Sequence, residues 1–292
     1  MIHTIKSDIL QVDINSVGAE LSSIYSVQMD REYLWQGDSA WWTGRAPILF
    51  PIVCSMKDNA YLYNDKTYEM PKHGFVRRAE FVAKEVNDSK IIFEYRDNEE
   101  TQKLYPFAFL LQVTFELVGN TLSTTYRVEN HNSNPMYFSI GAHEAYNCPL
   151  ESEEDFEDYY LEFEKDGTYI SETLTDLGLL NGETYNVIEN DHIIPLMQKW
   201  FDNDNTLIFK NVPSSRVFLK SKKSTTAVEI DYQNAPHLGV WKKTGAPYLC
   251  IEPWYGLPDY VDHDGNIKNK CGIVTLDANS DFTWTHNIII HE

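Results

Sequence analysis

Apolar and polar residues alternate with a period of two along most of this chain. In Lys90–Arg96, for example, Ile91, Phe93 and Tyr95 fall on one face, and Glu94 and Arg96 fall on the other. Successive side chains of a β-strand point to opposite faces of a sheet, so this pattern predicts half-buried strands. Further short runs of the same kind occur at residues 111–117, 122–128, 160–163, 206–209, 216–219, 227–230 and 282–290.

The breaks between these runs indicate how the strands connect. Gly119-Asn120 separates two alternating runs and predicts a β-hairpin. Helical periodicity is weak, and only Leu196–Phe201 is expected to form a turn or two. Many short strands favour an all-β fold, a large antiparallel sandwich or barrel, and we expect residues 1–292 to form one domain. The acidic stretch Glu151–Asp158 is predicted to be a solvated loop.

Charge excludes several classes of partner. The chain has 24 basic and 44 acidic residues, for a net charge of −20. Nucleic-acid binding depends on basic residues that displace counterions, and anionic membranes repel an acidic surface. No uncharged apolar run reaches the roughly 18 residues of a membrane span, and the first residues lack a basic start followed by an apolar run. We expect a cytoplasmic monomer or homodimer.

The four cysteines indicate the same compartment. Cys54, Cys148, Cys250 and Cys271 are scattered and form no C-x-x-C pair. They are too few and too widely spaced for a disulfide framework or a zinc knuckle. The sequence therefore predicts buried free thiols in a reducing environment.

Four segments combine glycine or proline with ionisable and aromatic residues. Glycine lets the backbone approach a ligand closely, and proline fixes the direction of a loop. A carboxylate and an imidazole on such loops suit proton transfer, since one accepts and the other donates a proton near neutral pH. Spacing alone also allows structural histidines and a simple turn carboxylate at Glu252. The segments are residues 44–51, 72–78, 139–147 and 250–256.

Taken together, these segments resemble the aldose 1-epimerase (mutarotase) family, most closely its LacX-like branch. Gly44–Pro51 resembles the family's arginine loop, and Lys72-His73-Gly74-Phe75 resembles its first histidine loop. Ile140-Gly141-Ala142-His143 is similar to the second histidine motif, and Ile251–Gly256 to the glutamate motif, the most specific of the set. The chain departs from the family at Gly141–Glu144, where Gly-Gly-His-Pro is more usual.

The resemblance implies a galactose-mutarotase-like supersandwich that interconverts the α and β anomers of a hexose or hexose 6-phosphate. It implies no metal and no cofactor. Carried over residue by residue, Glu252 is the general base and His143 the general acid. His73 and Arg45 hold the sugar and its ring oxygen. The sugar-binding aspartate falls within Asp202–Asn205, where Asp204 fits best because it leads into the strand at residues 207–209.

Protonation of His143 requires support, because a general acid must carry its proton near neutrality. Neighbouring carboxylates keep an imidazole charged, and the adjacent Glu144 is our candidate for this role.

A basic cluster bears on the choice of substrate. Lys72, Arg77 and Arg78 flank His73 in an otherwise acidic chain. Arginine binds phosphate oxygens in bidentate fashion, so we hypothesise a phosphosugar site that involves Arg77. The alternative is that Arg77 and Arg78 pair with surface carboxylates.

Tryptophans are candidates for stacking on the sugar. Trp254 lies inside the glutamate motif and is assigned to the sugar site, with Trp41, Trp42 and Trp241 as alternatives. Most aromatic side chains must nevertheless serve packing.

Three other function classes compete with an epimerase. A non-catalytic sugar-binding or sugar-sensing sandwich would not need these ionisable groups on separate loops. A metal-dependent enzyme could use His73, His143 and Glu252, although no short histidine spacing supports it. A glycoside hydrolase requires two catalytic carboxylates, and the motifs supply one.

Overall fold

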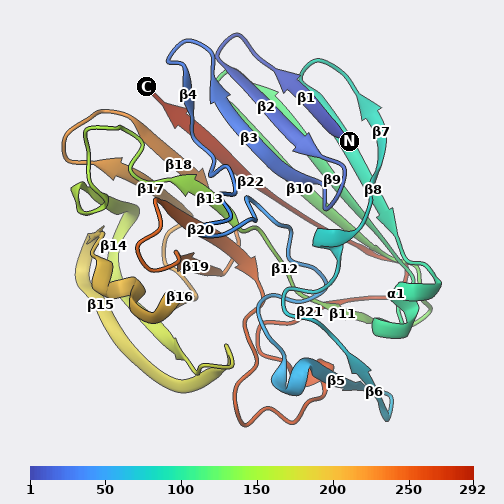
Figure 1. The fold of residues 1–292 in the computed structure, drawn as a ribbon. Helices are drawn as coiled ribbons and strands as arrows, with labels where there is room; N and C mark the ends of the chain where they lie inside the picture. Colours follow the sequence, from blue (N-terminus) through green and yellow to red (C-terminus); the bar gives the residue numbers. More distant parts are fainter.

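The computed structural model describes residues 1–292 and is built mainly from antiparallel strands, as the alternation predicts (Figure 1). Its largest sheet has fourteen strands. Twelve follow one hydrogen-bonded path, in the order β12 (Ile140–Gly141), β20 (Tyr248–Tyr255), β19 (His237–Trp241), β16 (Thr206–Lys210), β14 (Tyr159–Leu174), β17 (Arg216–Ser221), β18 (Ala227–Asp231), β22 (Asp281–His291), β10 (Thr121–Asn130), β9 (Phe109–Val118), β8 (Lys90–Arg96) and β7 (Val82–Val86). The other two, β13 (Glu144–Asn147) and β15 (Leu180–Pro195), pair with β20 and β14.

Smaller elements complete the fold. A four-stranded sheet contains β1 (Ile2–Lys6), β2 (Leu10–Asn15), β3 (Glu20–Ser26) and β4 (Arg31–Glu32). Two strand pairs are β5 (Ala60–Tyr63) with β6 (Lys66–Glu69), and β11 (Met136–Phe138) with β21 (Val274–Leu276). The helices are short: α1 (Glu99–Leu104) and the 3₁₀ turns η1 (Lys57–Asn59), η2 (Val76–Arg78), η3 (Phe156–Asp158), η4 (Gln198–Asp204) and η5 (Ile267–Asn269). None of them has the length and apolar character that a bilayer crossing would need.

The four-stranded sheet packs against one part of the large sheet. In Figure 1, β1, β2 and β3 lie beside β9 and β10. Every second residue of β2 and of β10 is buried, so the apolar face of each strand points into the sandwich. One cluster of 62 buried residues runs from Ile5 to Ile290 and joins the two sheets. The expected antiparallel β-sandwich is confirmed.

Several local predictions are confirmed. The run at Lys90–Arg96 is β8, and β9 and β10 form the expected hairpin, with Val118 opposite Thr121. The helix α1 was not predicted, because Thr101 is its one buried residue and it therefore carries no apolar periodicity. Leu196–Phe201 partly overlaps the 3₁₀ turn η4.

The prediction of a solvated loop at Glu151–Asp158 is wrong in part. Phe156 is buried, and Glu154 is only 8% exposed. One carboxylate oxygen of Glu154 accepts a 2.8 Å hydrogen bond from the Ser221 hydroxyl. The acidic composition of this stretch gave no indication that Glu154 and Phe156 point inward.

All four cysteines are free, as expected, and Cys54, Cys148 and Cys250 are buried, whereas Cys271 is only partly buried.

A buried ion pair anchors the loop that follows Cys54. Lys270 Nζ lies 2.8 Å from Asp259 Oδ1, and the two side chains are 0% and 1% exposed. The other oxygen of Asp259 accepts a 3.0 Å hydrogen bond from the Lys57 amide. The Asp259 amide donates a 3.0 Å bond to the Ser55 carbonyl. Asp259 therefore holds the Ser55–Lys57 segment at two points.

Loss of the cation should destabilise the fold strongly. In Lys270→Met, the Asp259 carboxylate would stay buried without its partner, and breaking a buried pair costs about 3–5 kcal/mol. Urea unfolding measures this loss. The control is Lys268→Met, because Lys268 is exposed. Equal stability of the two variants would show that the pair contributes nothing.

Candidate active site

A pocket with a volume of about 190 Å³ opens over the β16–β19–β20 end of the large sheet. Each of the four glycine- or proline-containing segments contributes at least one residue to its wall. Leu174, the last residue of β14, and Gly178, in the loop that leads to β15, also line the pocket. The basic, imidazole and carboxylate side chains that line the pocket are Lys72, His73, Arg77, His143 and Glu252. The remaining lining residues are Trp42, Pro47, Cys54, Thr206, Trp241 and Trp254.

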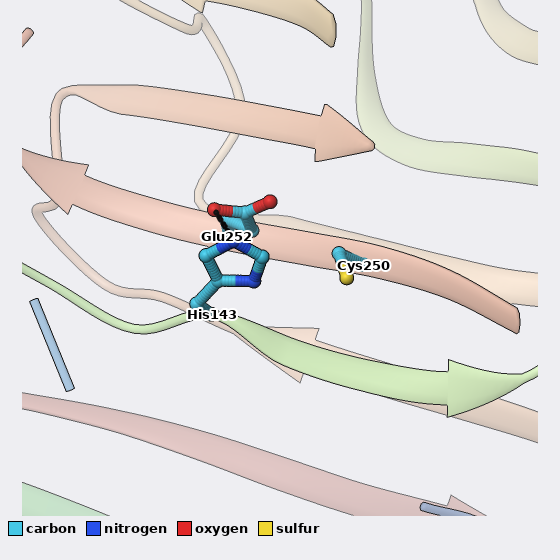
Figure 2. A group of neighbouring side chains, drawn as sticks. All are labelled: His143, Cys250 and Glu252. Carbon is cyan, nitrogen blue, oxygen red and sulfur yellow. Dashed lines mark ion pairs between the residues drawn. The ribbon is translucent and has the colours of Figure 1, made fainter. Parts of the chain in front are cut away.

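His143 and Glu252 face one another in this pocket, as Figure 2 shows. His143 Nε2 lies 3.4 Å from Glu252 Oε2, and both side chains are almost fully buried. Glu252 is in the middle of β20, and His143 connects β12 to β13, which both pair with β20. The Trp42 ring stacks on the imidazole at a centroid distance of 5.0 Å. Strand pairing and stacking together fix the orientation of His143.

His73 forms a second imidazole wall. Its Nδ1 accepts a 3.1 Å hydrogen bond from the Cys54 amide, so the neutral ring carries its proton on Nε2. The ring centroid lies 5.5 Å from that of His143, and the two planes are nearly perpendicular. Burial lowers the pKa of His73 well below 6.5. His73 is therefore a neutral hydrogen-bond donor at physiological pH.

Trp254 forms the floor of the pocket. The ring is fully buried, although it lines the cavity. A Cβ atom at Gly141 or at Gly239 would overlap the indole, so the ring lies between two positions that must lack a side chain. The half-buried rings of Trp42 and Trp241 are better placed than Trp254 to stack on a sugar.

Arg45 and Asp204 do not line the pocket. The Arg45 guanidinium donates a 2.8 Å hydrogen bond to the Ser22 carbonyl. The Asp204 side chain accepts a 2.8 Å bond from the Thr244 amide, and its backbone carbonyl accepts one of 3.1 Å from the Trp241 indole. Asp204 thus positions Trp241 from outside the cavity.

Two cations other than Arg45 supply positive charge to the pocket wall. Lys72 and Arg77 line the pocket, and neither lies within 4.0 Å of a carboxylate. Arg78 also has no carboxylate partner, but it is exposed and faces a different hollow beside Phe75. The alternative interpretation, that Arg77 and Arg78 pair with surface carboxylates, is wrong.

Burial controls the protonation of the facing pair. It lowers the pKa of His143 to about 3. It also raises the pKa of Glu252 well above 4.5, while the positive charge of Lys72 acts in the opposite direction. Both groups therefore favour their neutral forms, which is opposite to the expectation that His143 rests protonated.

The hypothesis that Glu144 supports a charged His143 is wrong. Glu144 lies opposite Ile251 in the β13–β20 pairing, one residue away from Glu252. Neighbouring residues of a strand point to opposite faces, so the Glu144 side chain enters the sandwich interior. There, its Oε1 lies 3.1 Å from His286 Nε2.

Two groups of side chains have donors suited to a metal ion. His143, Cys250 and Glu252 place a nitrogen, a sulfur and an oxygen atom within 4.8 Å of one another. His73 is not part of this group, although our metal-dependent alternative included it. The second group is at the β14–β15 hairpin and consists of Asp166, Asp191 and His192, of which the two carboxylates are exposed.

Comparison with known proteins identifies the family of the chain. The family model described as aldose 1-epimerase matches residues 1–284. The chain belongs to the aldose 1-epimerase family. It is 35% identical over 275 residues to the plasmid-encoded protein LacX of Lactococcus lactis, with 91% of each chain covered.

Solved structures show the same family fold. A galactose mutarotase related enzyme from Lactobacillus acidophilus superposes with a TM-score of 0.95 at 33% identity, over 100% of this chain and 98% of that one. A galactose mutarotase-like protein from Lactobacillus casei gives 0.94 at 30% identity, over 100% of both chains. The resemblance to the LacX-like branch and the expected mutarotase-like sandwich are confirmed.

Some lining residues of this aldose 1-epimerase family member could not be predicted from local sequence. Leu174, Gly178 and Thr206 carry no chemical motif, and they reach the pocket only through the pairing of β14 with β15 and β16. Lys72 was visible as part of the basic cluster, but its place in the pocket depends on the fold.

Proposed function

We propose that this protein is an aldose 1-epimerase that interconverts the α and β anomers of a hexose as a single domain. The observation that supports this most directly is the 3.4 Å approach of His143 to Glu252 in a pocket bordered by His73 and three tryptophans. Ring opening needs a base and an acid on either side of the C1–O5 bond, and this pair supplies both.

The reaction proceeds by two coupled proton transfers. Glu252 takes the proton of the C1 hydroxyl while His143 protonates the ring oxygen O5. The C1–O5 bond breaks, and C1 becomes an aldehyde carbon. After rotation about C1–C2, the transfers reverse and the ring closes on the other face. A positioned acid or base contributes about 10²–10⁴ in rate.

The pair needs only one proton for this cycle. Burial raises the pKa of Glu252 and lowers that of His143, which favours a proton on the Glu252 carboxyl and a neutral His143 before the sugar binds. Transfer across the 3.4 Å contact gives a carboxylate and an imidazolium. A bound sugar favours this charged form, because its C1 hydroxyl donates to the carboxylate and its ring oxygen accepts from the imidazolium. His143 therefore does not need a proton from solvent to become the acid.

Loss of the carboxylate should remove most of the activity. Glu252→Gln keeps the shape of the side chain but cannot accept the C1 proton, so anomer exchange should fall about 10²–10⁴-fold. Polarimetry of freshly dissolved α-glucose and NMR exchange spectroscopy measure the rate.

Glu183→Gln is the matched control, since Glu183 is an exposed carboxylate on β15. Sugar binding by the wild-type protein without faster anomer exchange would contradict the proposal. That result would instead identify a non-catalytic sugar-binding sandwich.

A hexose 6-phosphate is the substrate that we propose within this class. The support is the pair of cations Lys72 and Arg77, which line the pocket and have no carboxylate partner. Both charges also lower the pKa of His143. A phosphate bound between them would offset this effect and help His143 to hold its proton.

Removal of Arg77 should therefore discriminate between sugars. A hydrogen bond to a charged group contributes about 1.5–3 kcal/mol, so kcat/KM of Arg77→Ala for glucose 6-phosphate should fall about 10–100-fold relative to that for glucose. Arg78→Ala serves as the control, because Arg78 lies outside the pocket. An equal loss on both sugars would exclude a phosphate role for Arg77.

The pH dependence should report the raised pKa of Glu252. The active form of the pair carries one proton, and above that pKa the pair loses it and His143 has none to give to the ring oxygen, so kcat/KM should fall as pH rises through the raised pKa of Glu252. Lys72 lowers the pKa of Glu252, so Lys72→Met should move the alkaline limb of the profile to higher pH. Lys66→Met, a change at an exposed lysine on β6, should leave the limb in place. An unshifted limb in Lys72→Met would show that its charge does not reach Glu252.

A further inference from the structure

Cys250 lies beside the acid–base pair, and the proposed reaction gives it no role. It precedes Glu252 by two residues on β20, so both side chains point to the same face of the sheet. Figure 2 shows Glu252 and Cys250 on this strand with the His143 ring beside them. Candidate ligand atoms of the three residues lie within 4.8 Å of one another.

We propose that His143, Cys250 and Glu252 form a binding site for a thiophilic divalent cation such as Zn²⁺ or Cd²⁺, and that its occupation inhibits the enzyme. Inhibition follows because the ion would take the lone pairs that the acid–base pair uses for proton transfer. This inhibitory part rests on the proposed epimerase function, whereas the binding itself does not.

The donor set matches the coordination chemistry of zinc. Imidazole nitrogen, thiolate sulfur and carboxylate oxygen are the three protein donors that Zn²⁺ takes. Three protein ligands leave a fourth position for water or a sugar hydroxyl. One thiolate and one carboxylate balance the two charges of the ion, so the complex is neutral, as a buried site requires. Binding forms metal–sulfur, metal–oxygen and metal–nitrogen bonds, and the thiol proton of Cys250 and the carboxyl proton of Glu252 both leave to solvent.

The spacing needs only a small adjustment. Zinc–ligand bonds of about 2.0–2.3 Å place tetrahedral ligands roughly 3.3–3.6 Å apart. The 3.4 Å distance between His143 and Glu252 already fits. The Cys250 sulfur lies within 4.8 Å of the other two donors and must approach them by up to about 1.5 Å, which a side-chain rotation can supply. The buried Nδ1 of His143 has no hydrogen-bond partner on another residue, so no such bond holds the ring against a small rotation.

Access and selectivity also favour this trio. His143 and Glu252 line the pocket, so an ion can reach them from solvent. His73 is less available, because its Nδ1 already accepts a bond from the Cys54 amide. The exposed group at Asp166, Asp191 and His192 has no thiol. Thiolate ligands favour soft ions over Mg²⁺ and Ca²⁺.

Direct binding tests the site without any activity measurement. Titration calorimetry with ZnCl₂ and CdCl₂ should show one ion per wild-type chain, and Cd²⁺ should produce a thiolate charge-transfer band in the ultraviolet. Cys250→Ala should bind at least tenfold more weakly and lose the band. Cys54→Ala should keep both, although Cys54 also lines the pocket. Unchanged binding by Cys250→Ala, or no stoichiometric binding by the wild-type protein, would overturn the proposal.

Anomer exchange tests the inhibition. Zn²⁺ should slow the wild-type protein, EDTA should restore the rate, and a higher sugar concentration should weaken the effect. Each variant is compared with its own metal-free rate, and Cys250→Ala should be at least tenfold less sensitive to Zn²⁺. If Cys250→Ala does not fold by near-ultraviolet circular dichroism, Cys250→Ser takes its place.

The two proposals can fail separately. A wild-type protein that binds Zn²⁺ through Cys250 but lacks epimerase activity contradicts the proposed function alone. An active enzyme that Zn²⁺ leaves unaffected contradicts the inhibition.

Discussion

The register of β20 is the constraint on which the site depends. Antiparallel pairing with β12, β13 and β19 fixes which side chains of β20 face the pocket. Cys250, Glu252 and Trp254 share that face, and Ile251 points into the sandwich. A slip of one residue would exchange the two sets, because side chains alternate along a strand. The carboxylate would then be replaced by hydrocarbon, and no local rearrangement could restore the chemistry.

Burial provides the second condition for function. The low dielectric that surrounds His143 and Glu252 favours neutral groups, so the pair keeps a single proton between them instead of two separate charges. Lys72 and Arg77 add positive charge at the edge of this region, in a chain whose net charge is −20. These two cations give the pocket local positive charge on an acidic protein, and under the proposed function that charge would attract a hexose 6-phosphate.

Local patterns predicted much of the fold and part of the site. Strand β8 and the β9–β10 hairpin could be predicted, because the alternation of apolar and polar residues and the residues that favour turns are visible within a few consecutive positions. The motif histidines and Glu252 do line one pocket. The roles of Arg45 and Asp204 could not be predicted, because the direction of each side chain is set by a hydrogen-bond partner distant in sequence, Ser22 for Arg45 and Thr244 for Asp204. The position of Glu144 depends on strand pairing, which no motif records.

The indole of Trp254 between Gly141 and Gly239 has an evolutionary consequence. The three positions come from three different strands but act as one steric unit, because the ring occupies the space that two side chains would need. A smaller residue at 254 would leave a void, and a larger one at 141 or 239 would displace the ring. Homologous sequences should therefore preserve this trio intact or exchange its members together, and an isolated change at one of them should be rare.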